Sequence, residues 1–122
     1  MSDSSAPSAS SVIDDLREPT RNLRRAIPDT FKAFAGLHAA ALEDGVLPAR
    51  MKELIALAIG VAKQCDGCIA YHAKAAARAG ATADEVAETL GVALLMDGGP
   101  GTVYGPRAFA AFLEFAEEMS ED

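Results

Sequence analysis

Hydrophobic residues recur at steps of three and four along most of this chain, which is the spacing of one helix face. The pattern predicts a helix over 12–26, with Pro19 as a break or a helix start, a second over 28–43, and a third from 49 onward. The segment 64–67 is the natural place for the third helix to end, because an unbroken run to Ala79 would be long for a globular protein.

The second half of the chain predicts three more helices. One runs over 68–78 and ends before Gly80, a common residue after a helix. Thr82 and Glu85 match a capping box, with Thr82 as N-cap, and start a helix that reaches about Met96. The run 97–101 breaks the chain, and a last helix covers about 103–119. No segment alternates as a strand does, so we expect an all-α fold of about six helices.

Length and composition place these helices in one domain. The chain has 122 residues, of which 50% are hydrophobic but only 6% aromatic, with no Trp, which favours closely packed helices. We expect a disordered, Ser-rich tail over 1–11 and a helical domain over 12–122. A mean hydropathy of +0.12 in so small a protein predicts apolar surface buried between subunits.

The charge and the N-terminus exclude several classes of protein. A formal net charge of -7 argues against nucleic acid as the main partner. No apolar stretch reaches the roughly 20 residues of a membrane span, so no membrane partner is expected. The first residues lack the basic start and apolar core of a signal peptide. We therefore expect a cytoplasmic protein, in which paired cysteines serve redox chemistry or metal binding.

The two cysteines of the chain, Cys65 and Cys68, fall in one short run where a helix is predicted to begin. The free N–H groups and the macrodipole of a helix N-terminus stabilise a thiolate, and the thiolate is the form that attacks peroxides and disulfides. His72 follows Cys68 by four residues, so a helix would put the imidazole within reach of the thiol as a base. Glu53, in the preceding apolar helix, is the carboxylate we expect to orient that imidazole.

Other interpretations of these residues stay open at this point. The cysteines could be two small buried residues at a helix start. A zinc site would need four ligands, and Cys65, Cys68, His72 and His38 are the cysteines and histidines available. His38 lies on another helix, where a satisfied packing role is common, and Glu53 could be an ordinary solvated carboxylate.

The order Glu53, eleven residues, Cys65, two residues, Cys68, three residues, His72 resembles the AhpD-like alkylhydroperoxidases of the carboxymuconolactone decarboxylase family. The flanking segments 52–58, 68–76, 80–82 and 98–100 are similar to that family too. The resemblance covers roughly residues 47–112, most of the predicted folded chain.

The resemblance implies a fold, a reaction and partners. It implies an all-helical protein that forms a homotrimer or homohexamer. Cys68 would reduce a hydroperoxide, Cys65 would donate a proton and then resolve the sulfenic acid to a disulfide, and Glu53 with His72 would relay protons. A dithiol of the lipoyl type, or a small redox protein, would be the reductant. No cofactor or metal is expected.

Gly67 is a departure from the pattern of that family. The best-studied peroxidase members carry a histidine directly before the second cysteine, so the resemblance implies that this chain lacks one proton donor of those members. The alternative function is a non-catalytic redox sensor or assembly protein whose CxxC pair switches the oligomeric state. Decarboxylation is not expected, because the decarboxylases of the superfamily generally lack the CxxC pair.

Overall fold

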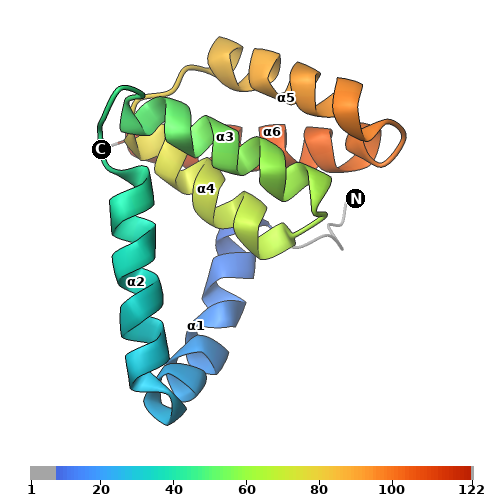
Figure 1. The fold of residues 1–122 in the computed structure, drawn as a ribbon. Helices are drawn as coiled ribbons and strands as arrows, with labels where there is room; N and C mark the ends of the chain where they lie inside the picture. The colour runs from blue at the N-terminus through green and yellow to red at the C-terminus, as the bar shows by residue number, and fades with distance from the viewer. Residues whose placement is uncertain (1–7, 122) are drawn as a thin grey trace, which may run out of the picture.

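The computed structural model describes residues 8–121, and these form an all-α fold, as predicted (Figure 1). Among these residues no strand occurs. The six helices are α1 (Ala9–Ala26), α2 (Pro28–Leu42), α3 (Ala49–Ala62), α4 (Asp66–Arg78), α5 (Ala83–Asp97) and α6 (Gly101–Ser120). No helix in the described part of the chain is long and apolar enough to cross a membrane.

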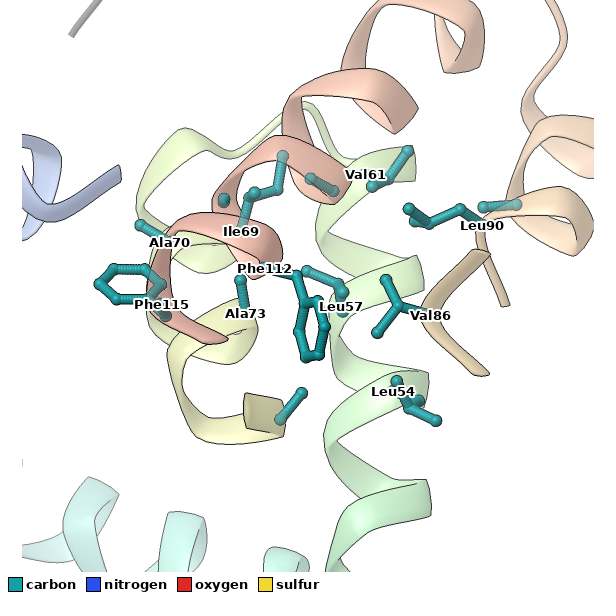
Figure 2. Close-up of a cluster of buried hydrophobic side chains, with 14 of the residues drawn as sticks. Leu54, Leu57, Val61, Ile69, Ala70, Ala73, Val86, Leu90, Phe112 and Phe115 are labelled. Carbon is teal, nitrogen blue, oxygen red and sulfur yellow. The ribbon is translucent and has the colours of Figure 1, made fainter. Parts of the chain in front are cut away.

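The hydrophobic core lies between α3, α4, α5 and α6 (Figure 2). Phe112 and Phe115 of α6 are at most 2% exposed, and each buried aromatic ring contributes roughly 2–3 kcal/mol of burial free energy. The buried residues of α4, the helix that packs on α6, are Ile69 and three alanines, namely Ala70, Ala73 and Ala76. These small side chains let α6 bring its rings close to the helix that carries the cysteine motif.

The first helix begins earlier than the sequence pattern predicted. Ser8 is the N-cap of α1, and its side chain accepts a hydrogen bond from the backbone N–H of Ser11. The Glu114 carboxylate of α6 accepts two more, from the N–H groups of Ala9 at 3.0 Å and Ser10 at 3.2 Å. The predicted tail is therefore wrong for 9–11, which are helical, whereas 1–7 lie outside the described residues.

Pro19 lies inside an unbroken α1, so the break or helix start predicted there is wrong. Proline removes one hydrogen bond to the carbonyl four residues earlier, that of Asp15. Both residues are exposed, so that carbonyl is not trapped in the core.

α1 and α2 form an angled hairpin that projects from the body formed by the other four helices (Figure 1). The start of α1 packs on α4 and α6, but α2 contributes no buried residue. Phe34 and Leu37 of α2 are 62% and 63% exposed. The hairpin therefore carries apolar side chains that this chain does not cover by itself.

Candidate active site

The junction between α3 and α4 holds the cysteine motif in a tight turn that backbone hydrogen bonds close. Gln64 has a φ of 56°, in the left-handed region, and ends α3. The N–H of Gln64 donates to the carbonyl of Val61 at 3.0 Å, and the N–H of Cys65 donates to that of Gly60 at 3.1 Å. These two bonds form a Schellman motif, which satisfies the last carbonyls of α3 and delivers the chain directly to Cys65.

Cys65 also caps the next helix. Its Sγ atom accepts a hydrogen bond from the N–H of Cys68 at 3.1 Å, so α4 begins at Asp66, two residues before the predicted start. Cys65 and Cys68 form a disulfide, with their Cα atoms 5.2 Å apart. Both residues are half-buried. The pair therefore sits in the first turn of a helix, where the helix dipole would stabilise a thiolate after reduction.

Glu53 of α3 and His72 of α4 are hydrogen-bonded, with 2.7 Å between Oε1 and Nδ1. They lie 19 residues apart in sequence, so the packing of α3 on α4 brings them together. Glu53 is only 8% exposed, and it is the buried charged residue of the described core. A buried carboxylate needs a partner, so the interpretation of Glu53 as a solvated carboxylate is wrong.

This hydrogen bond leaves one ring nitrogen of His72 available. An ionised carboxylate can only accept, so Nδ1–H donates to Glu53 and Nε2 keeps its lone pair in the neutral ring. His72 follows Cys68 by one helical turn, on the same side of α4. The imidazole can therefore accept a proton on Nε2 while Glu53 stabilises the resulting charge.

Two contacts that the sequence pattern does not reveal shape the cysteine motif. Gly60 of α3 is buried, and a Cβ there would lie 3.3 Å from the Cβ of Cys68. A Cβ at Gly67 would lie 3.2 Å from Cδ1 of Leu16 on α1. α1 therefore places an aliphatic side chain where a side chain at position 67 would project. A glycine inside a predicted helix was the signal available for Gly60.

His38 is not the packed residue that its sequence context predicted. It is exposed on α2, and its ring lies parallel to that of His72, with 6.1 Å between centroids and 15° between planes. Phe34, one turn earlier on α2, lies 6.4 Å from the same ring. The structure thus brings both histidines of the chain to one place, which their spacing in sequence does not reveal.

The arrangement differs from the one that the zinc hypothesis needs. Cys65 and Cys68 are bonded to each other, and His72 is bonded to Glu53. Within residues 8–121, no group of three or more His, Cys, Asp or Glu side chains is placed to hold a metal ion. The geometry supports thiol–disulfide chemistry with an adjacent imidazole–carboxylate pair.

Comparisons with known proteins agree with this fold. A protein from Cupriavidus necator, itself uncharacterised, is 46% identical over 90 residues, which are 74% of this chain and 80% of that protein. The crystal structure of a carboxymuconolactone decarboxylase family protein from Legionella pneumophila is 41% identical, with a TM-score of 0.86 over 88% of this chain and 96% of that one.

A crystal structure from Thermotoga maritima, of a family protein suggested to take part in an antioxidative response, is 30% identical. It has a TM-score of 0.69 and covers 76% of this chain and 96% of its own. The sequence model of the carboxymuconolactone decarboxylase family matches residues 28–118, which include Glu53, both cysteines and His72. This chain belongs to the carboxymuconolactone decarboxylase family.

Proposed function

We propose that this protein is a thiol-dependent hydroperoxide reductase that turns over through a Cys65–Cys68 disulfide. The observation that carries the proposal is the placement of the disulfide in the first turn of α4, one turn before an imidazole held by the buried Glu53 carboxylate. These are the groups that peroxide reduction needs: a stabilised thiolate, a resolving thiol and a proton relay.

The proposed cycle begins with the reduced protein. His72 accepts the proton of the Cys68 thiol on Nε2, and the thiolate sulfur attacks the terminal oxygen of the hydroperoxide. The O–O bond breaks, the alkoxide leaves as an alcohol with a proton from the Cys65 thiol, and Cys68 becomes a sulfenic acid. The Cys65 thiolate then attacks the Cys68 sulfur, and the displaced hydroxide takes the proton from Nε2 of His72 and leaves as water as the disulfide forms. An external dithiol returns two electrons and two protons.

The relatives lend support at the level of the family. The Thermotoga maritima protein with a suggested antioxidative role has the same fold at 30% identity. A dithiol of the lipoyl type or a small redox protein remains the proposed reductant, because such a dithiol reduces a CxxC disulfide by exchange.

The decisive experiment measures consumption of cumene hydroperoxide with dihydrolipoamide as reductant. The wild type should turn over, Cys68→Ser should not, and Cys65→Ser should accumulate a Cys68 sulfenic acid that dimedone traps for mass spectrometry. Full activity of Cys68→Ser would overturn the assignment of Cys68 as the attacking residue.

The alternative function, a redox sensor, makes a different prediction. Leu16 of α1 lies against Gly67, the residue before Cys68. A structural change in the cysteine motif on oxidation would therefore reach the projecting hairpin through this contact. A large change in mass between reduced and oxidised protein on size-exclusion chromatography, without peroxide turnover, would favour the sensor. Turnover at constant mass would favour the reductase.

We also propose that the chain assembles as a homo-oligomer, a trimer or a hexamer. Val92, Leu95 and Met96 of α5 are 62%, 80% and 81% exposed, and they share one face of that helix. They form surface of the kind that subunit contacts bury. Light scattering should give three or six chains for the wild type, and Leu95→Asp should lower that number.

A further inference from the structure

A hollow of about 380 Å³ lies between α1, α2 and α4, the three helices that frame the open triangle in Figure 1. Both histidines of the chain, His38 and His72, are part of its wall. Three more wall residues carry permanent positive charge, namely Arg17 of α1 and Lys74 and Arg78 of α4. The remaining wall residues are Ile13, Tyr71 and Ala75. The wall of this hollow thus holds three cations and no carboxylate, and the Glu53 carboxylate lies behind it, hydrogen-bonded to His72.

This lining runs against the charge of the whole molecule. The chain has 18 acidic residues and only 11 lysines and arginines, which gives a formal net charge of -7. A hollow lined by an average sample of this chain would hold more carboxylates than cations. Cations gathered in one concave place raise the local concentration of anions there.

The positive charges are little neutralised by the protein itself. Arg17 pairs with Asp14 at 3.3 Å, but both side chains are at least 60% exposed, so this pair is weak. Lys74 lies 5.8 Å above the ring of Phe115, a contact that leaves its charge in place. Within residues 8–121, Arg78 makes no salt bridge at all.

A second hollow, of about 440 Å³, shares the wall residue His38 with the first. Phe31 and Phe34 give it an apolar wall, and Arg24 and Lys32 again supply cations without a carboxylate. The two hollows together offer apolar surface and positive charge around the pair of imidazoles. That combination fits a ligand with an apolar body and an acidic group better than it fits hydrogen peroxide.

We propose that the hollow binds the carboxylate of an organic hydroperoxide and so makes the protein selective for anionic substrates. The inference rests on the proposed peroxide reduction. Arg17 and Arg78 would hold the carboxylate by charge-assisted hydrogen bonds, and the peroxide group would reach His72, one turn from Cys68. The reaction itself is unchanged: the hydroperoxide becomes an alcohol, and the dithiol supplies the two electrons.

The kinetic test compares two substrates that differ in one charge: cumene hydroperoxide with a para-carboxylate, and the methyl ester of that compound. The wild type should show a kcat/KM about tenfold higher for the carboxylate, and added salt should reduce the difference. Arg17→Gln combined with Arg78→Gln should bring the ratio of the two kcat/KM values close to one. Arg25→Gln is the matched control, because Arg25 also lies in the last turn of a helix but lines neither hollow.

Equal kcat/KM values for acid and ester in the wild type would overturn the proposal. The proposal would also be overturned if the double variant had the same ratio of the two kcat/KM values as the wild type. Absence of Cys68-dependent turnover with unsubstituted cumene hydroperoxide would instead count against the proposed function.

Direct binding separates these two failures, because it needs no turnover. The probe is para-isopropylbenzoate, which has no peroxide group, and the readout is the NMR signals of the His38 and His72 rings in the full chain. Saturable shifts with the acid, weaker with the neutral amide and lost in the double variant, would support the anion site. Identical responses to acid and amide would overturn it.

Discussion

Gly60 faces Cys68 across the interface between α3 and α4 and leaves little room there for a side chain. A Cβ at position 60 would come within 3.3 Å of the Cβ of Cys68 and 3.6 Å of the backbone nitrogen of Ile69. The missing side chain lets the first turn of α4 rest on α3. The same interface carries the hydrogen bond between Glu53 and His72, so the close approach at one end sets the geometry of the relay at the other.

Gly60→Ala should therefore destabilise the protein, although alanine favours a helix. Cys68 Cβ must give by a few tenths of an ångström to admit the added methyl group, and overpacking of this kind costs about 1–3 kcal/mol, more than the 0.5–1 kcal/mol gained in helix propensity. Gly91→Ala is the matched control, since nothing lies within 4 Å of a Cβ there and that variant should gain stability. Urea unfolding of both variants measures the difference. If the free energy of unfolding changed by the same sign and amount in both variants, the approach of the new methyl group to Cys68 would carry no cost.

Glu53→Gln should lower peroxide turnover by about a hundredfold, with the fold intact. The amide keeps the size and can still accept from Nδ1–H of His72, but it cannot stabilise a charged imidazole. Glu88→Gln, on the exposed side of α5, is the control and should behave as the wild type. Stopped-flow kinetics of Cys68 oxidation measures the effect, and an equal rate in the two variants would remove Glu53 from the relay.

Gln64 occupies a backbone conformation that glycine adopts more easily. At the end of α4 the same Schellman motif is built with Gly80, whose φ is 90°. Gln64→Gly should stabilise the protein by up to about 1 kcal/mol, because a side chain in the left-handed region costs roughly 1–2 kcal/mol and glycine regains part of this. Gln64→Val should destabilise it, since a β-branched residue is more strained there. A higher melting temperature for Gln64→Val than for Gln64→Gly would contradict this account of the junction.

Local features of the fold could be predicted from sequence. The capping box of Thr82 and Glu85 is formed as predicted, with hydrogen bonds of 3.1 Å and 2.9 Å, because its partners lie three residues apart. The start of α1 could not be predicted in this way, because the N–H of Ala9 donates to the Glu114 carboxylate, which lies 105 residues away in sequence. Hydrophobic spacing reports which face a helix buries, and it says nothing about such distant caps.

In the candidate site, too, local spacing predicts some features and contacts between distant residues decide the others. One helix carries Cys65 and Cys68 at its first turn and His72 beyond them, so their grouping follows from spacing alone. The sequence predicts Glu53, in the apolar helix before the cysteines, as the carboxylate partner of His72, and the structure pairs the two residues. The exposed position of His38 does not follow from its spacing in sequence, because the ring beside it is that of His72 on another helix.

Leu16 and Gly67 give the last prediction, which concerns the histidine that this chain lacks. A Cβ at position 67 would lie 3.2 Å from Cδ1 of Leu16, so in Gly67→His the Leu16 side chain must move away from the motif. We expect a loss of about 1–3 kcal/mol in the free energy of unfolding. Leu16→Ala removes the obstructing methyl groups, and in that background the histidine should cost less than in the wild type.

A double-mutant cycle of these two positions, measured by urea unfolding, gives the coupling directly. A coupling of about 1 kcal/mol in favour of the double variant would show that Leu16 occupies the place of the missing histidine. The double variant should also reduce cumene hydroperoxide faster than Leu16→Ala alone, because it regains a proton donor beside Cys68. Additive stabilities would mean that α1 yields without cost, and the absence of a histidine would then need an explanation other than packing.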